Sequence, residues 1–571
     1  QPMSDQFHEP KARRPLRDVV SDIDRDILRL LMRRHNLLRK MRNARGFLDA
    51  SEEKGLREAW EAAVARVSRD ARLSSRFFSL MQEVDFLPRP EDGEERRASF
   101  NLAPPALPVR LDMEAPLACR ATRAWLFLAA ASGRPLTLGP CLMNDPIVDC
   151  VKLLNQMGAA LNREDSGVTA AEAAPMTAPD KVLHVGDSAW NFYLALAFYL
   201  GRPSRTKFTG ETSLKLADFS PLRRLMPSLG ARLVHVVPRS DGFPIRMECS
   251  GILPDMLRLP ADVSIELAEA LLLAAPFHER PLCVDLADHP DREMLRSRTL
   301  PILRAVNARL EENGDAIRVL PSTLDLPRRP LVPMEPELAL FLLALAPALG
   351  GEARLTGRWP QDAAARAGLD LLSSCGARVS AGEDAVTCSA DVPLAALPAQ
   401  ALPSPGGDFP AGWMPLPVAL AAAAALRGGE AALPAFSDAQ FQADVQGFLT
   451  DLGLDARDGR VCLRSVAATN ESGGDGGERP ADRHPWNAPS PVWALALAVA
   501  ACAHGPRAGF KLGNPGIVTA LYPAFWALYN GLPEPRPQRP AEKPAPAAAP
   551  RRRRVITNAI AVLPEPRDDE A

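Results

Sequence analysis

The chain has 571 residues, more than one hydrophobic core organises, so we expect two to four folding units of about 100–200 residues each. Its formal net charge of −2, with 47% hydrophobic and 24% charged residues, gives no overall field to attract nucleic acid or an anionic membrane. The nine cysteines are dispersed, with no CxxC pair and no histidine at metal-ligand spacing, so we expect free thiols, no metal and no cofactor. No apolar run reaches the ~18–20 residues that span a bilayer, and the sequence predicts a cytoplasmic protein without a membrane partner.

The first ninety residues have the pattern of an all-helical domain. Between residues 15 and 46, apolar side chains recur at alternating spacings of four and three, which predicts one long amphipathic helix with a coiled-coil-like seam: Leu16, Val20, Ile23, Ile27, Leu30, Leu37 and Met41. A polar turn over 49–55 and two shorter helices over 56–67 and 74–87 are expected to follow. Three such helices make a poor monomeric core, so we expect an intertwined homodimer that buries the seam against a second copy.

Arg34 falls on this apolar seam, where a guanidinium is costly unless an anion pairs with it. Arg45 follows three helical turns later on nearly the same side, and Arg57 and Glu58 lie one turn into the next helix. Arg17 is ~25 Å from Arg34 along the helix, so only an antiparallel partner could bring its own Arg17 to the site. The pattern indicates a carboxylate site completed in the dimer. The alternative is that these arginines are helix-surface charges paired with nearby acidic residues.

The same segment resembles the all-helical chorismate mutase family, whose pattern opens with Leu-Arg-x-x-Ile-x-x-(Leu/Ile)-Asp. Residues 16–24 read LRDVVSDID, the family's catalytic lysine falls on Arg45, and its following Arg-Glu pair falls on residues 57–58. The sequence departs from the family at Lys54, where an aspartate is usual, and at Asp85 and Arg89, where the third helix supplies Ser and Gln.

The resemblance implies a pericyclic rearrangement of chorismate to prephenate, which needs positioning and positive charge rather than a nucleophile. It also implies the roles of the site residues: Arg17 of the partner subunit and Arg34 clamp carboxylates, Arg45 binds a carboxylate and the ether oxygen, Arg57 supports the second carboxylate, Glu58 takes the hydroxyl, and Arg89 is a further candidate donor to the substrate.

Beyond residue 90 the composition changes twice. Residues 91–108 are rich in Pro, Glu and Asp and predict a linker, and residues 109–533 alternate short β-like runs with Ala- and Leu-rich helices. Within this α/β region one helix–turn–strand–helix–strand unit recurs, as over 124–161 and 338–386, which indicates a fold built from copies of one unit. The remaining segment, 534–571, is a Pro/Ala/Arg-rich tail.

From Leu111 onward the chain resembles the enolpyruvylshikimate phosphate synthase family. Residues 123–133 (RAWLFLAAASG) are similar to its first helix and glycine turn, and the segments NDPI at 144–147 and TGE at 209–211 follow in family order. The resemblance implies an enolpyruvyl transferase fold of the inside-out barrel type, with three β/α copies in each lobe. The lobes are expected at about 116–330 and at 331–533 with 109–115, with the active site in the cleft between them.

Several side chains that this family uses to bind phosphorylated substrates are absent. Its lysine in the opening Pro-Gly-Ser-Lys-Ser signature is Ala118, and its Gly-Asn-Ala-Gly-Thr-Ala-Met-Arg loop reads GDSAWNFY over 186–193. This loop therefore places Trp190 in the expected phosphate cradle and loses the arginine at Tyr193. The residual cleft positions are Arg123, Ser264 and Asp438.

We therefore expect a chorismate mutase of aromatic amino-acid biosynthesis, carried by a synthase-like domain that is not catalytic and serves stability, regulation or docking to other enzymes of that pathway. One alternative is a non-catalytic scaffold or effector-binding protein of the shikimate pathway. The other is a 3-phosphoshikimate 1-carboxyvinyltransferase with an atypical site.

Overall fold

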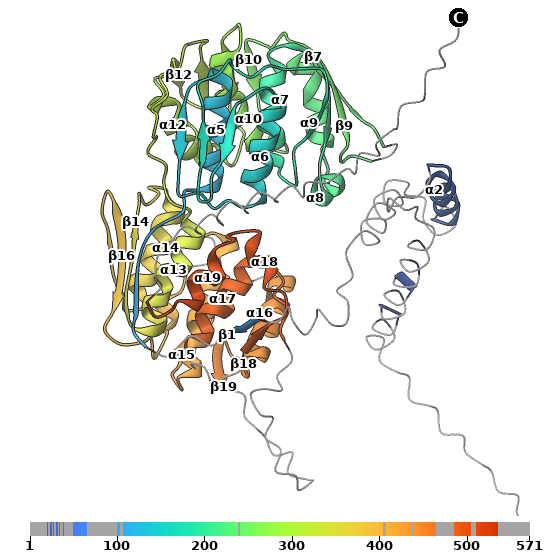
Figure 1. Ribbon diagram of the computed structural model, residues 1–571. Coiled ribbons are helices and arrows are strands. Elements are labelled where there is room, and N and C mark those ends of the chain that lie inside the picture. Colours follow the sequence, from blue (N-terminus) through green and yellow to red (C-terminus); the bar gives the residue numbers. More distant parts are fainter. Residues whose placement is uncertain are drawn as a thin grey trace, which may run out of the picture.

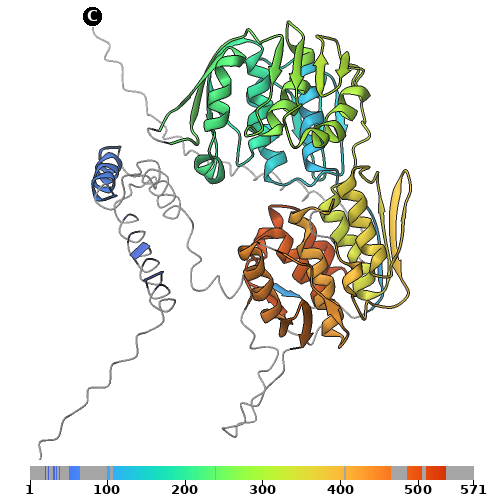
Figure 2. The same ribbon diagram turned by 180° about the vertical axis from the view of Figure 1, so that it is seen from behind.

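The structure, a computed structural model, describes residues 20, 23–24, 27, 30–31, 34, 38, 50–64, 100–102, 107–237, 240–403, 407–436, 438–463, 485–503 and 510–534. Most of these residues form two α/β lobes, drawn one above the other in Figure 1. Figure 2 shows the same two lobes from behind. The predicted α/β class of this region is confirmed.

The first lobe contains three copies of a unit in which strands and an outer helix surround one buried helix. The buried helices pack against one another: α5 (Cys119–Ser132), α7 (Ala189–Leu200) and α10 (Ile265–Ala274). In α7 every residue from Trp190 to Leu200 is buried, which is the pattern of a helix enclosed on all sides rather than lying on a surface. The outer helices are α6 (Asp145–Gln156), α8 (Thr212–Leu216), α9 (Ser220–Leu225), α11 (Arg292–Arg298) and α12 (Leu300–Ala305).

Three sheets enclose these helices. The first has the order β3-β5-β4, the second β6-β7-β9-β8 and the third β10-β11-β13-β12. Their strands are β3 (Leu136–Leu138), β4 (Leu161–Arg163), β5 (Val168–Ala170), β6 (Val182–His184), β7 (Pro203–Thr209), β8 (Ala231–His235), β9 (Ile245–Ser250), β10 (Met256–Arg258), β11 (Leu282–Asp285), β12 (Leu310–Asn313) and β13 (Ala316–Val319).

The second lobe repeats this plan. Its buried helices are α13 (Pro336–Leu349), α15 (Pro415–Leu426) and α17 (Pro491–Ala501), and the more peripheral helices are α14 (Ala363–Ser374), α16 (Ala439–Asp451), α18 (Gly516–Thr519) and α19 (Phe525–Asn530). Its sheets have the orders β15-β16-β14-β2, β17-β19-β18 and β1-β20. The strands are β1 (Phe100–Leu102), β2 (Val109–Glu114), β14 (Gly351–Thr356), β15 (Arg378–Ala381), β16 (Ala385–Ala390), β17 (Ala431–Ala432), β18 (Leu454–Arg457), β19 (Arg460–Leu463) and β20 (Phe510–Leu512).

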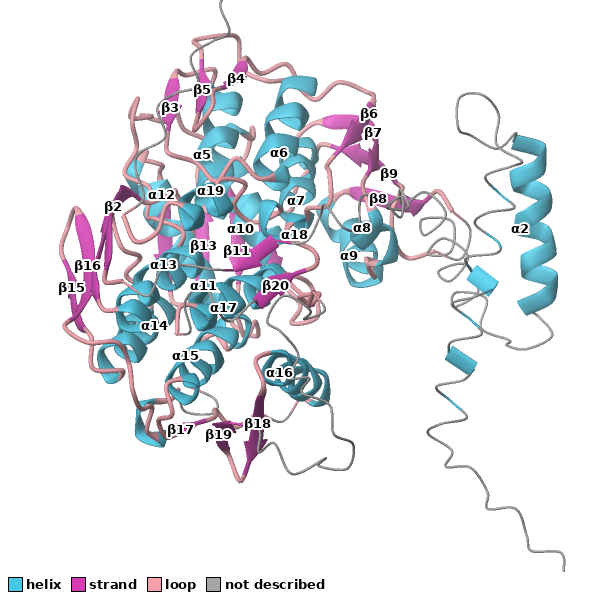
Figure 3. Ribbon diagram, turned by 60° about the horizontal axis from the view of Figure 1, so that its bottom comes forward, coloured by secondary structure: helices cyan, strands magenta, loops and turns pink. Residues whose placement is uncertain are grey.

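Figure 3 shows sheets of both lobes at the margins of the molecule, with the helices between them. This is the inside-out arrangement that the family resemblance implies. The parallel pairing of β2 with β14 needs a glycine at position 351, because a Cβ there would stand 2.2 Å from the carbonyl oxygen of Val109.

The chain crosses between the lobes twice, and the two crossings are hydrogen-bonded to each other. The Ala118 N–H donates to the Pro333 carbonyl at 2.8 Å, and the Glu335 N–H donates to the Pro116 carbonyl at 2.8 Å. Leu117 also forms an isolated β-bridge with Met334. The crossings therefore fix the start of α5 in one lobe beside the start of α13 in the other.

Two predictions near the N-terminus need correction. Residues 100–102 fall in the predicted linker but form β1, which pairs antiparallel with β20, and Leu102 is almost fully buried. The predicted turn at 49–55 is wrong from residue 50 on, because α2 spans Ala50–Val64. No proline interrupts residues 50–64, so this polar stretch is compatible with helix.

The other described residues of the N-terminal segment, between 20 and 38, are helical, as predicted. The predicted third helix at 74–87 lies outside the described residues, as does the tail after 534. Within the described part of the chain, no helix combines the length and apolarity that crossing a membrane requires.

Candidate inter-lobe site

A carboxylate from the second lobe caps a helix of the first. Helix α5 begins after Ala118, whose side chain cannot cap it. The Cys119 N–H, at the first position of the helix, donates instead to Glu335 Oε2 at 2.8 Å. Glu335 immediately precedes α13, so the two crossing segments bring it to this position. An anion is favourable at a helix N-terminus because the unpaired N–H groups and the helix dipole both attract it.

Three neutral groups hold Arg123, which lies one turn further along α5. Its Nη1 donates to Ser188 Oγ at 2.7 Å and to Asn191 Oδ1 at 3.1 Å, and its Nε donates to the Cys119 carbonyl at 3.2 Å. The side chain is 8% exposed. The buried cation lies near Glu335, where it lowers the pKa of that carboxyl against the larger, opposite effect of burial.

Two carboxyl groups at the start of α13 have raised pKa values. Burial raises the pKa of Glu335, and the Cys119 N–H and Arg123 only partly oppose this. Burial, with the neighbouring Glu335, raises the pKa of Glu337 to about 7. With a pKa of about 7, Glu337 can act as a proton donor or acceptor near neutral pH.

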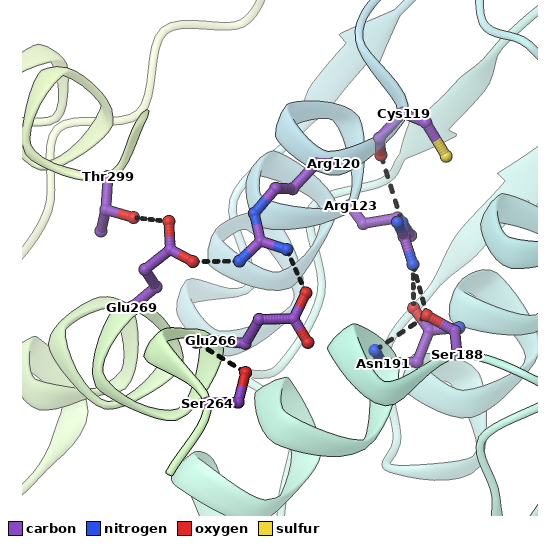
Figure 4. Close-up of polar contacts among 9 residues, drawn as sticks. All are labelled: Cys119, Arg120, Arg123, Ser188, Asn191, Ser264, Glu266, Glu269 and Thr299. Atoms are coloured by element: carbon purple, nitrogen blue, oxygen red, sulfur yellow. Dashed lines mark hydrogen bonds and ion pairs between the residues drawn. The ribbon is translucent and has the colours of Figure 1, made fainter. Parts of the chain in front are cut away.

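Beside this network, Arg120 is enclosed by two carboxylates, which Figure 4 shows, and by the indole ring of Trp190. Its Nη1 lies 2.5 Å from Glu266 Oε1, and its Nη2 contacts Glu269 Oε2. The guanidinium carbon lies 3.8 Å from the centre of the Trp190 ring. Glu269 is fully buried and also accepts a hydrogen bond from Thr299 Oγ1 at 3.1 Å, and burial raises the pKa of its carboxyl despite Arg120.

The predicted residual cleft positions behave differently from one another. The structure brings Arg123 into the inter-lobe network, whereas Ser264 caps α10 by accepting from the Glu266 N–H at 3.3 Å. Asp438 is exposed and caps α16 by accepting from the Phe441 N–H at 2.8 Å. Among the described residues, no hydrogen bond or ion pair joins Asp438 to Arg123, so its structural role is that of a helix cap.

Of the predicted chorismate-site residues, Arg17, Arg45 and Arg89 lie outside the described residues. Arg34 and Arg57 are helical and half-buried, and both interact with other groups. Glu58 lies 3.8 Å from Lys54 in an exposed i,i+4 pair.

Four residues of this site were not predicted from the sequence, namely Arg120, Glu269, Glu335 and Glu337. The role of Asn144 was not predicted either: its Nδ2 donates to the Leu521 carbonyl at 3.2 Å and so joins the lobes. One signal was available: Glu266 and Glu269 are spaced i,i+3 on an otherwise apolar helix, where an acidic side chain needs a partner.

Comparisons with known proteins give one consistent result. Residues 113–411 match the family EPSP synthase (3-phosphoshikimate 1-carboxyvinyltransferase). The 3-phosphoshikimate 1-carboxyvinyltransferase of Methanothermobacter thermautotrophicus is 23% identical over 268 residues, 46% of this chain and 62% of that protein. The enzyme of the same name from Methanosphaerula palustris is 24% identical over 286 residues, 49% of this chain and 67% of that protein. The first match thus spans less than two thirds of its relative.

Among solved structures, EPSP synthase from Acinetobacter baumannii superimposes with a TM-score of 0.58 at 18% identity, covering 76% of this chain and 98% of that chain. At this identity the superposition shows a shared fold.

Proposed function

The chain belongs to the EPSP synthase family, and from this membership we propose that its two-lobed domain is a carboxyvinyl transferase with an atypical site. In such a transfer, an acceptor hydroxyl gives up its proton as its oxygen bonds to C2 of phosphoenolpyruvate, and C3 takes up a proton. The bond from C2 to the phosphate oxygen then breaks as C3 gives up a proton. An alcohol and phosphoenolpyruvate thus become an enolpyruvyl ether and inorganic phosphate.

The observation that carries this proposal is the position of Glu335. Its carboxylate comes from the second lobe, is fixed by the Cys119 N–H of the first, and lies near the buried cation of Arg123. The transfer needs a group that gives and takes protons beside a cation that stabilises developing negative charge. Glu335 and Arg123 are suited to these two roles, and Glu337, with a pKa of about 7, is a second proton carrier nearby.

The proposal is tested by incubating purified protein with phosphoenolpyruvate and an acceptor, supplied in parallel as shikimate 3-phosphate and as shikimate. We expect release of inorganic phosphate that requires the acceptor, together with a new enolpyruvyl product in mass spectrometry. Phosphate release that does not exceed the protein-free background with either acceptor would reject transferase activity.

The non-catalytic alternative has one structural observation in its favour: Arg120, the cation beside Trp190, is already paired with two carboxylates. The resemblance to the family also implies that Ala118 stands where the family has a lysine. In that case the domain would bind a pathway metabolite as an effector, or dock a partner enzyme, without turnover. Saturable ligand binding in the absence of any product would support this alternative over the transferase.

For the first ninety residues, chorismate mutase activity in a homodimer stays a proposal. It is motivated by the half-buried Arg34 and Arg57 and by four apolar residues on the first helix that are between 46% and 60% exposed: Val20, Ile23, Ile27 and Leu30. A second copy would cover these residues and supply its own Arg17. We expect chorismate consumption that Arg34→Ala lowers by at least ~100-fold. Equal rates for wild type and variant would reject the proposed site.

A further inference from the structure

The class of acceptor can be addressed from the residues around Arg120, on the premise that the proposed transfer takes place. We infer that the subsite formed by Arg120, Trp190, Glu266 and Glu269 excludes a phosphate group, and that the acceptor alcohol carries none.

The position itself would suit an anion. Arg120 lies between the N-termini of two helices, α7 and α10, and each of these helices is capped by a serine, Ser188 or Ser264. A guanidinium close to helix N-termini is a common setting for binding phosphate, because the fixed fork of N–H groups and the free backbone N–H groups all donate to it. Whether phosphate can bind here therefore depends on what occupies these donors.

Two carboxylates already occupy the guanidinium. Glu266, in the first turn of α10, takes one terminal nitrogen of Arg120, and Glu269, one turn later, takes the other. Glu266 also lies where the helix dipole favours a negative charge, so the protein supplies its own anion at this N-terminus. An incoming phosphate would have to displace both carboxylates to reach the two terminal nitrogens.

Charge repulsion acts in the same direction. Two carboxylates and one guanidinium leave the cluster with one net negative charge, and Glu269 is 0% exposed, so water screens this charge little. At ~6 Å and an effective dielectric constant of ~20, one net negative charge weakens the binding of a single negative charge by about 100-fold. A hydroxyl group at the same place brings no charge and meets no such penalty.

Trp190 holds the arrangement in place. Its ring is 3% exposed, and the Arg120 guanidinium lies over its face, so moving Arg120 out toward a phosphate would break a cation–π contact in addition to two ion pairs. The subsite is thus closed to phosphate by charge, by occupancy and by packing.

The test measures binding by calorimetry, so that it does not depend on turnover. Wild-type full-length protein is titrated with shikimate 3-phosphate and with shikimate, which has the same ring without its phosphate. The double variant Glu266→Gln/Glu269→Gln keeps the side-chain volumes but releases the Arg120 guanidinium. A third protein adds Arg120→Met to this pair. The matched control Glu164→Gln/Asp165→Asn removes the same formal charge from two exposed residues of the same lobe.

We expect wild type to bind shikimate at least ~10-fold more tightly than shikimate 3-phosphate. The double variant should gain about 100-fold in affinity for shikimate 3-phosphate, the added Arg120→Met should abolish that gain, and the control pair should leave the affinity unchanged. Should the Glu269→Gln change prevent folding, judged by circular dichroism, Glu266→Gln alone should give about a tenfold gain.

Wild-type protein that binds shikimate 3-phosphate as tightly as shikimate would overturn the inference, and so would a folded variant with no gain. A different result would reject the transferase proposal: the protein binds shikimate more tightly than shikimate 3-phosphate but forms no product from phosphoenolpyruvate.

Discussion

Two arginines one turn apart on the same helix show how differently a fold can use the same side chain. Arg123 is nearly buried and bonded to two side-chain oxygens and a backbone carbonyl, all neutral, so its charge acts on Glu335 across the lobe junction. Arg120 is bonded to Glu266 and Glu269, so its charge is balanced within its own lobe. We therefore expect the proposed proton exchange beside Arg123, and the proposed exclusion of phosphate beside Arg120.

The largest expected effect is on the Arg123 side. Glu335→Gln keeps the shape of the side chain but removes its proton exchange, so we expect carboxyvinyl transfer to fall by about 1,000-fold with little change in acceptor affinity. Phosphate release and calorimetry measure the two quantities. Glu352→Gln, on an exposed residue of the same lobe, is the control. If the rate of transfer falls by less than about tenfold, Glu335 is not the proton carrier.

On the Arg120 side the expected effect is on stability. Arg120→Met leaves the carboxylates of Glu266 and Glu269 without their partner, and we expect the free energy of unfolding in denaturant titrations to fall by about 3 kcal/mol. Combining it with Glu266→Gln and Glu269→Gln should restore most of this loss. If Arg120→Met alone is neutral, the ion pairs contribute little and the contrast between the two arginines weakens.

A smaller effect is expected from Glu337, whose pKa is about 7 in the folded protein against an ordinary value of 4.5. Because the folded state holds the proton more tightly, this group contributes stability that is complete below pH 4.5 and is lost as pH rises through about 7. Glu337→Gln should therefore raise the free energy of unfolding by roughly 1–3 kcal/mol at about pH 8 and leave it unchanged at about pH 4.

Thermal and denaturant unfolding at the two pH values check this prediction, with Glu383→Gln on an exposed loop as the matched control. A stabilisation of the same size at both pH values would show that titration is not its cause.

The smallest effect is expected outside both arginine networks. Asp438→Ala removes the cap of α16 and should lower the free energy of unfolding by about 1 kcal/mol while ligand affinities stay unchanged. If the variant instead changes the affinity for phosphoenolpyruvate or the acceptor, Asp438 belongs to the ligand site as well as capping α16.

Much of the fold could be predicted because its signals are local. The helices over 338–349, 415–426 and 493–501 are apolar on every face, and such helices must lie at the centre of a lobe. Strand β1 escaped prediction because three residues in a polar segment carry little pattern, and only pairing with Phe510–Leu512 makes them a strand.

The candidate site could be predicted less well. Arg123 was recognisable from the segment that surrounds it, and Trp190 from the loop that it alters. Glu335 gave no such signal, because it lies 216 residues from the Cys119 N–H that it caps. A capping aspartate and a catalytic one look alike in sequence, so the cleft role of Asp438 stays a prediction beside its observed role as the cap of α16.

The sequence by itself determined the class of fold and the repeated units, since both are written in neighbouring residues. Only the tertiary structure decided what the two arginines of α5 do. The effect of each charge depends on which acidic groups fold near it, Glu266 and Glu269 for Arg120 and Glu335 for Arg123. Electrostatic energy depends on distance and burial rather than on order along the chain.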